Sequence, residues 1–326
     1  MNMNRPLYWN QGLLLQPHHF QLQDLYFQSL LDPYQRFMQP YLWGVGRLEI
    51  QESALGNRAF SLTGGEFLLP DGTHIILPGN ALVEARSFEE DWIEGEKPLT
   101  VLLGLRKYNE IGENVTVVPD LENLTEITTR FVTTADSEEI PDLYQEGPTA
   151  QIRRMHYLLK IFWGSEIDQL GDYLLVPLAQ ITRSGEDIIV AEQFIPPSLT
   201  LSASERLMKV VLEIRDQIAA RGTQLEAYKR ERGIHTAEFG ARDMVYLLAL
   251  RSLNRYIPAL HHMTDSGHVH PWWVYGIVRQ MIGELSSFSE GVSVMGGTEN
   301  ETRQLPKYDH RNLWHCFHEA QLLVTR

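Results

Sequence analysis

The chain has 326 residues, of which 43% are hydrophobic and 21% charged, so it is long enough for two domains and has a globular rather than a disordered composition. Its 42 acidic and 28 basic residues give a net charge of −14. Proteins that bind nucleic acid usually present a basic face, so that class is disfavoured. The single cysteine, Cys316, excludes an intramolecular disulfide.

The chain opens with an apolar and aromatic strip, and residues 8–21 have the sequence YWNQGLLLQPHHFQ. It could be a targeting signal, a histidine pair for metal binding or catalysis, or a strip that docks onto a partner. A secretory signal needs an unbroken apolar region of about 7 to 15 residues and a small-residue cleavage site, and neither is present. No stretch reaches the roughly 18 to 20 apolar residues of a membrane-spanning helix. We therefore expect a cytoplasmic protein with no direct membrane insertion.

Such a strip cannot bury itself alone ahead of a folded domain. Docking would remove on the order of several hundred Å2 of apolar surface from water, at about 25 cal/mol per Å2. The alternative is that the strip packs on the chain's own β-domain, with its histidines serving as packing or hydrogen-bonding groups. The candidate docking residues are Tyr8, Trp9, Leu13, Leu14, Leu15, His18, His19 and Phe20.

A helix is predicted from Pro17 to about Met38, because proline suits a first helical turn and apolar residues then recur at spacings of three and four. Pro33 should kink or divide it. The recurring apolar residues are Phe27, Leu30, Leu31, Tyr34, Phe37 and Met38.

Short strands are predicted from about Leu42 to Gln193, where β-branched and aromatic runs alternate with turn residues. The segments LLPDGTHIIL and ITRSGEDIIV each predict a hairpin. This density of strands indicates an antiparallel β-sandwich.

An acidic run lies within this region. Between Glu110 and Glu146 there are ten acidic residues and one basic residue, Arg130. The run is either a set of solvated loops or a contact surface for a basic partner. It lacks the regular ligand spacing of a calcium-binding loop.

The break between the two regions is predicted at Pro196-Pro197, which can continue neither a strand nor a helix. Ser202 and Glu205 have capping-box spacing, so a helix should follow. Apolar stripes then predict an α-helical bundle. The stripes are Leu207, Val211, Ile214 and Ile218; Met244, Leu247, Leu248, Arg251 and Tyr256, with Val245 and Leu250 widening this apolar face; Val274, Val278, Met281 and Leu285; and, in a last helix from Asp309 to Val324, Leu313, Phe317, Ala320 and Val324.

The predicted helix that begins at Pro271 has apolar residues around most of its circumference, so it needs to be covered on every side. Three copies of the chain packed about an axis would supply that cover. The predicted packing residues of the bundle and of a homotrimer are Leu207, Val211, Ile214, Trp272, Trp273, Ile277 and Val278.

Catalytic and metal-binding motifs are weak. The turn from His261 to His270 contains four histidines, but His261 and His262 are adjacent and would point about 100° apart on a helix. No phosphate-binding loop, nucleophile elbow or H-E-x-x-H motif occurs. We expect no enzyme activity and no cofactor, and keep as the alternative a metal-dependent enzyme or binding module at the histidine-rich turn.

The opening strip resembles the start of the TssK (ImpJ/VasE) family of type VI secretion baseplate subunits. The matching positions are Trp9, Gly12, Leu13 to Leu15, Pro17, His19, Phe20, Gln21 and Asp24, followed by PYLWGVGRLEI, LPDGT and EQFIPPSLTLSAS.

The resemblance implies an α+β multidomain protein: a docking strip and helix at 1–40, a β-sandwich shell like the shoulder of phage receptor-binding proteins at 41–195, and a helical neck at 196–315. Residues 316–326 would begin a C-terminal head, at the point where this sequence ends. The resemblance also implies a homotrimeric structural adaptor at the inner-membrane-attached baseplate. Its partners would be the wedge proteins TssF and TssG and, through the head, the membrane-complex proteins TssL and TssM.

Overall fold

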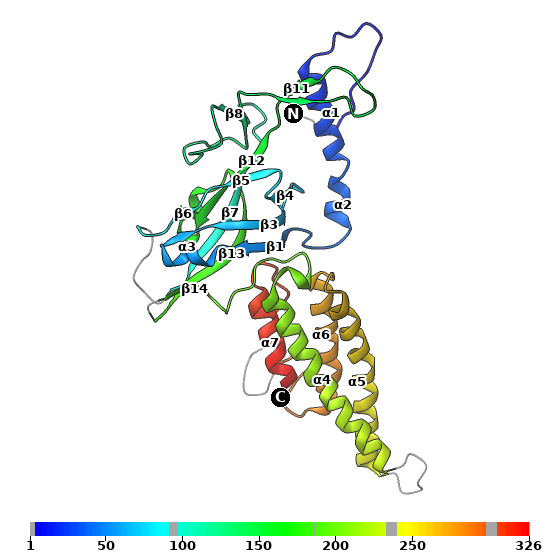
Figure 1. Ribbon diagram of the computed structural model, residues 1–326. Coiled ribbons are helices and arrows are strands. Elements are labelled where there is room, and N and C mark those ends of the chain that lie inside the picture. Colours follow the sequence, from blue (N-terminus) through cyan, green and yellow to red (C-terminus); the bar gives the residue numbers. More distant parts are fainter. Residues whose placement is uncertain (1–3, 91–96, 186, 233–239, 298–304, 326) are drawn as a thin grey trace. The chain divides into compact units, whose positions relative to one another are not determined.

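A computed structural model describes residues 4–90, 97–185, 187–232, 240–297 and 305–325 (Figure 1). The chain forms two compact units, which we describe separately. The β-rich unit comprises residues 1–44, 49–176 and 183–189, and the helical unit comprises residues 45–48, 177–182 and 190–326.

The predicted first helix is divided in two, because Pro33 lies in the first turn of the second helix, where its missing amide hydrogen costs nothing. The elements up to residue 190 are α1 (Pro17–Ser29), α2 (Asp32–Phe37), β1 (Gly44–Ile50), α3 (Glu52–Gly56), β2 (Ala59–Phe60), β3 (Leu62–Leu68), β4 (His74–Leu77), β5 (Ala81–Val83), β6 (Arg86–Ser87), β7 (Leu99–Arg106), β8 (Val115–Val118), β9 (Phe131–Thr134), β10 (Glu138–Ile140), β11 (Ala150–Ile152), β12 (His156–Trp163), a 3-10 helix (Gly164–Gln169), β13 (Tyr173–Ser184) and β14 (Asp187–Val190).

The largest sheet has seven strands in the order β14-β13-β7-β12-β9-β8, with β5 also paired to β12. Both predicted hairpins are confirmed, since β3 pairs antiparallel with β4 and β14 neighbours β13. The predicted antiparallel pairing does not hold throughout, because β5 runs parallel to β12 and β8 parallel to β9. The chain between β8 and β9 supplies the crossover that a parallel pair requires.

The β-rich unit buries several aromatic side chains. Phe60, Phe67, Phe88 and Trp163 are fully buried, and the rings of Phe88 and Trp163 meet edge to face at 6.1 Å between centroids. Two smaller two-stranded sheets, β2–β6 and β10–β11, and the three-stranded sheet β1-β3-β4 complete the described strands.

The helical unit contains a 3-10 turn (Leu201–Ala203), α4 (Glu205–Arg232), α5 (Ala241–Ser266), α6 (Pro271–Leu285), a second 3-10 turn (Ser286–Phe288) and α7 (Leu313–Thr325). The predicted stripe of α4 is buried as expected, and so is that of α7. On α5 the predicted stripe is buried only in part. Tyr256 and Leu250 are buried as expected, but Met244 and Leu248 are exposed, and the buried Leu253 and Leu260 were not predicted.

One further prediction about this unit needs correction. The hydroxyl of Ser204, not that of Ser202, accepts the N–H of Leu207 at 3.4 Å and caps α4. Cys316, Phe317, Ala320 and Val324 of α7 share one buried cluster with α4 and α6, and a domain boundary at residue 316 stays a prediction. No helix among the described residues is long and apolar enough to cross a membrane.

Candidate protein-docking site

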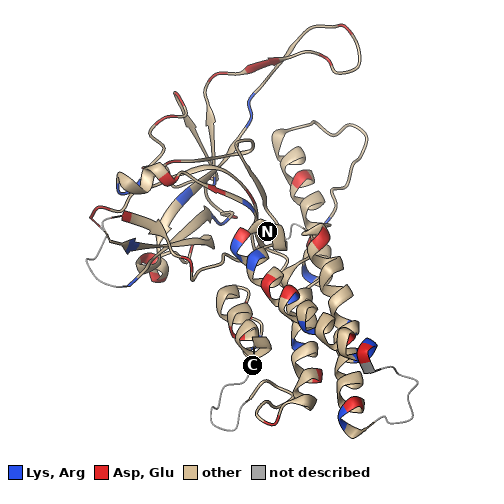
Figure 2. Cartoon of the chain, turned by 60° about the horizontal axis from the view of Figure 1, so that its bottom comes forward, with Lys and Arg blue, Asp and Glu red and all other residues tan. Residues whose placement is uncertain are grey.

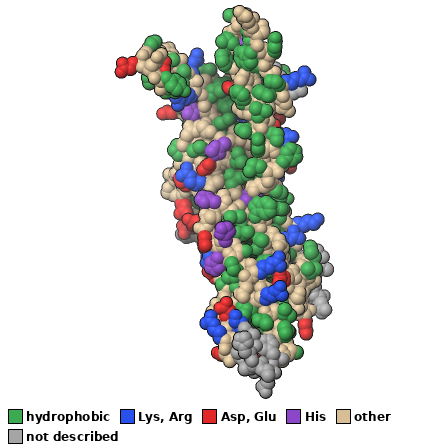
Figure 3. Space-filling view, turned by 90° about the vertical axis from the view of Figure 1, so that its right-hand side faces the viewer, with side chains coloured by type: hydrophobic (Ala, Val, Ile, Leu, Met, Phe, Trp, Pro, Cys, Tyr) green, Lys and Arg blue, Asp and Glu red, His purple; other side chains and the backbone are tan. Residues whose placement is uncertain are grey.

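The N-terminal arm, which we define as residues 4–43, presents apolar side chains to solvent (Figure 3). Both of its helices are fully described, and neither contains a buried residue. Tyr8 is 86% exposed and Phe37 82% exposed. The other exposed large apolar side chains of the arm up to α2's end are Trp9, Leu14, Leu15, Phe20, Phe27, Leu30, Leu31, Tyr34 and Met38.

Local interactions explain how the first helix of the arm begins. Pro17 occupies the first helical position, and the backbone N–H of Gln16 donates to Nδ1 of His19 at 3.1 Å. The ring of Trp9 lies 6.1 Å from that of His19, centroid to centroid. His19 therefore has a structural role at the start of α1, while His18 beside it is exposed.

Of the docking residues predicted from the sequence, most are exposed and only Leu13 and His19 are partly covered. The strip is thus not packed into the β-rich core of the isolated chain. The sequence prediction stopped at Phe20, whereas the exposed apolar surface continues to Met38. Its spacings of three and four were the available signal, but such a stripe is ordinarily taken to mean burial within the same chain.

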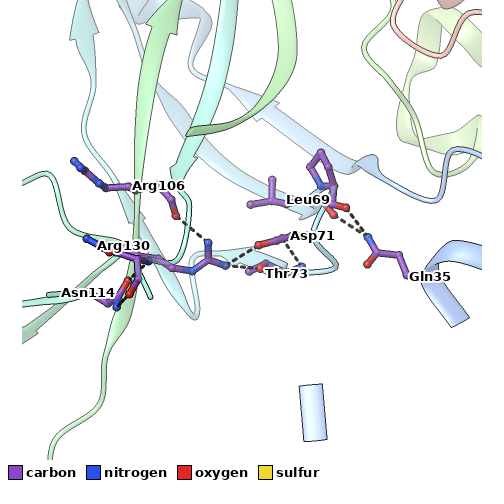
Figure 4. A network of polar contacts seen from close by, with 9 residues as sticks. Gln35, Leu69, Asp71, Thr73, Arg106, Asn114 and Arg130 are labelled. Atoms are coloured by element: carbon purple, nitrogen blue, oxygen red, sulfur yellow. Dashed lines mark hydrogen bonds and ion pairs between the residues drawn. The ribbon is translucent and has the colours of Figure 1, made fainter. Parts of the chain in front are cut away.

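The second helix of the arm contacts the β3–β4 turn, residues 69–73. The side-chain Nε2 of Gln35 donates to the carbonyl oxygens of Leu69 and Pro70, each at 3.2 Å (Figure 4). Gly72 has φ = +85°, and a Cβ placed there would lie 2.5 Å from Oε1 of Gln35. Glycine therefore suits this turn for its conformation and for the closeness of the arm.

All ten acidic residues between Glu110 and Glu146 are exposed, on the loops and the two-stranded β10–β11 ribbon of the β-rich unit (Figure 2). At the tip of this ribbon Leu143 and Tyr144 are also exposed. The geometry is that of solvated loops, and a contact with a basic partner remains a prediction.

The histidine-rich turn has a structural arrangement. Nδ1 of His270 accepts the backbone N–H of Trp272 at 3.2 Å and so caps α6, and its ring stacks on that of His310 at 5.3 Å. His261 and His262 lie within α5. Among the residues that the structure describes, no three His, Cys, Asp or Glu side chains are grouped closely enough to hold a metal ion.

The predicted packing residues of the bundle divide into two sets. Leu207, Val211, Ile214 and Val278 are buried inside the helical unit, and Trp272 and Ile277 are partly covered. Trp273 is 50% exposed. Three further apolar side chains, Met244, Val245 and Leu248, are exposed within about one turn of each other on α5.

A family model described as "Bacterial Type VI secretion, VC_A0110, EvfL, ImpJ, VasE" matches residues 19–326. The chain belongs to this VasE family. Another related protein is the type VI secretion system baseplate component TssK1 of Pseudomonas aeruginosa. It is 25% identical over 333 residues, and the match covers 100% of this chain and 69% of that protein.

Solved structures show that the VasE-family chain has the TssK fold. A chain of a type VI secretion baseplate complex matches with a TM-score of 0.83 and 24% identity, covering 100% of this chain and 99% of that one. A chain of a TssK-TssF-TssG baseplate subcomplex gives 0.79 and 22%, with 98% of each chain covered. A crystal structure of TssK gives 0.81 and 22%, with 98% of this chain and 68% of that chain covered.

Proposed function

We propose that the chain is a structural subunit of a type VI secretion baseplate and that its N-terminal arm binds the wedge proteins TssF and TssG. The observation that carries the proposal is the row of exposed aromatic and leucine side chains from Tyr8 to Met38. A chain of this fold occurs with TssF and TssG in a solved subcomplex. Exposed apolar surface of this extent marks interaction sites on soluble proteins.

The composition of the arm suits a binding surface. Aromatic residues and leucine supply large apolar area, and residues of this kind, the aromatic ones above all, anchor protein interfaces when a partner covers them. The arm has no buried side chain in α1 or α2, so its apolar surface is available without unfolding the core. A structural role, rather than an enzymatic one, is part of this proposal.

A homotrimer is the second part of the proposal. Met244, Val245 and Leu248 near the start of α5, and separately Trp273 near the start of α6, are exposed apolar side chains that a second and third copy would cover. Light scattering of the purified chain should give a mass three times 37.5 kDa. Replacing Met244 and Leu248 by serine should lower that mass, and a monomeric wild type would contradict the proposal.

The family resemblance assigns contacts with TssL and TssM to a C-terminal head, and we propose none of residues 1–326 for them.

Arm binding is tested by replacing Leu14, Leu31 and Phe37 together by serine. The three side chains are 77%, 66% and 82% exposed, so the variant should keep its melting temperature. Capture of co-expressed TssF and TssG should fall by at least about tenfold, the loss that removing one good interface anchor produces.

The matched control replaces Ile111, Leu143 and Tyr144 by serine, because these residues are 99%, 83% and 98% exposed but lie on the acidic loops. The control should capture TssF and TssG normally. If the arm variant binds normally and the control does not, the wedge contact lies on the acidic loops and the arm proposal fails.

A further inference from the structure

We propose that the β3–β4 turn fixes the orientation of the N-terminal arm and that Arg130 is the positioning residue that fixes the turn. The inference rests on the proposed function in one respect, since the arm is the surface assigned to TssF and TssG. It adds a residue that lies outside the arm.

The turn is shaped by its own backbone. Leu69 N–H donates to the carbonyl of Thr73 at 2.9 Å, and Gly72 N–H donates to the carbonyl of Leu69 at 2.9 Å. The carboxylate of Asp71 accepts the N–H of Thr73 at 3.0 Å. The Leu69 carbonyl oxygen that closes the turn also accepts the hydrogen bond from Gln35. A change in the conformation of the turn would therefore move an acceptor of the arm.

Arg130 holds this turn from the other side. Its Nη2 donates to the Asp71 carboxylate at 3.0 Å and to the Thr73 hydroxyl at 2.6 Å, while Nη1 donates to the carbonyl of Arg106 at 2.8 Å (Figure 4). Asp71 and Thr73, whose side chains accept hydrogen bonds from Arg130, are the two neighbours of Gly72 in the chain. A planar guanidinium presents its donors in a fixed geometry and can therefore hold these three acceptors in one defined arrangement, whereas a lysine ammonium is a compact charge on a flexible stem.

The surroundings of Arg130 make this contact stiff. Its side chain is only 6% exposed, and its guanidinium lies 5.8 Å and 5.6 Å from the ring centroids of Phe131 and Tyr157. These rings belong to β9 and β12, so the turn is tied to the seven-stranded sheet. A charged group this buried persists only where its hydrogen bonds are satisfied. Arg130 therefore links the sheet to the turn, and Gln35 links the turn to α2.

The test uses paired substitutions in the full chain, because Arg130→Met could unfold the β-rich unit. Thr73→Val removes the hydroxyl that Arg130 binds and keeps the shape of the side chain, whereas Thr73→Ser keeps the hydroxyl. Gln35→Ala removes the arm side of the contact, and Gln28→Ala is its control, since Gln28 is an exposed glutamine on α1.

The measurements are capture of TssF and TssG and amide hydrogen exchange at Tyr34 in α2 and at Met38, the residue that follows its last turn. Thr73→Val and Gln35→Ala should each raise the α2 exchange rate by about tenfold and weaken capture, as expected for loss of one or two hydrogen bonds. Thr73→Ser and Gln28→Ala should match the wild type in both.

If Thr73→Val leaves α2 exchange at the wild-type rate, the turn does not position the arm and the inference is overturned, whatever the wedge result. If exchange rises in Thr73→Val and Gln35→Ala but capture stays normal, the positioning role stands and the proposed docking function fails.

Discussion

Arg86 binds Glu166 through two parallel hydrogen bonds, from Nη1 to Oε2 at 2.7 Å and from Nη2 to Oε1 at 3.0 Å. Oε2 of Glu166 also accepts the backbone N–H of Trp163 at 2.7 Å, and the guanidinium of Arg86 lies over the Trp163 ring at 4.9 Å. Burial alone would raise the pKa of Glu166. The hydrogen bonds from Arg86 and from the Trp163 amide, with the charge of Arg86, outweigh it and lower the pKa.

Because the pKa of Glu166 is lower in the folded than in the unfolded chain, this carboxylate stabilises the fold above the unfolded pKa, and the stabilisation is lost as pH falls through the folded pKa. Glu166→Gln should reduce the free energy of unfolding at pH 7 by about 1 to 2 kcal/mol, since the pair is partly exposed. Urea unfolding at pH 7 and pH 4 measures this. The difference between wild type and variant should shrink at pH 4, and a constant difference would show that lost packing, not charge, is responsible.

The two serines before α4 should behave differently. Ser204→Ala removes the hydroxyl that caps Leu207 N–H, so thermal or urea unfolding should show a loss of about 1 kcal/mol. Ser202→Ala is the matched control, because its hydroxyl interacts with that of Thr200 at 3.1 Å and caps no helix. A larger loss of unfolding free energy in Ser202→Ala than in Ser204→Ala would instead show that Ser202 is the cap, as the sequence predicted.

His270→Ala should destabilise the start of α6, whereas His270→Asn should retain most of the cap, because asparagine is a good N-cap residue. We expect a difference of about 1 kcal/mol between the two variants in the free energy of unfolding.

The melting temperature of the wild type should not change when zinc is added. A rise with stoichiometric zinc would instead support the metal-dependent alternative, since a ligand that binds the folded state raises its stability.

Cys316 should resist labelling in the native protein. Its side chain is fully buried, and burial raises the pKa of its thiol, so little thiolate is present or accessible at neutral pH. Ellman's reagent should react with one thiol per chain in denaturant and only slowly without it. Fast labelling of the native chain would mean that α7 separates readily from the helical core.

Local patterns in the sequence were sufficient for much of this fold. Turn residues identified both hairpins, Pro33 identified the break in the first helix, and the stripe beginning at Leu207 identified the buried face of α4. Each depends on residues close together in the chain. The parallel pairing of β5 with β12 depends on contacts between segments far apart in the chain, which no local pattern encodes.

The sequence predictions were wrong where two nearby residues suit the same role equally well. On α5 apolar residues occur on several faces, so periodicity alone did not select Leu253 over Leu248 for the core. Ser202 and Ser204 lie two residues apart, and a 3-10 turn between them moves the cap to the second. The sequence predicted the apolar strip, which is mostly exposed in the structure, and its docking role stays a prediction. The exposure of α2 and the hydrogen bond from Arg130 to Asp71 depend on how distant segments fold together, and no local pattern predicted them.

The burial of Arg130 has an electrostatic consequence for the stretch between Glu110 and Glu146. Its only cation faces inward, so ten carboxylates meet solvent, of which Glu138 has a partner in Arg154 at 3.5 Å. Like charges repel over a Debye length of about 8 Å at physiological salt. Any two copies that bring these loops within that range repel each other, and added salt weakens the repulsion. Close approach of neighbouring chains through this edge should therefore become easier as ionic strength rises.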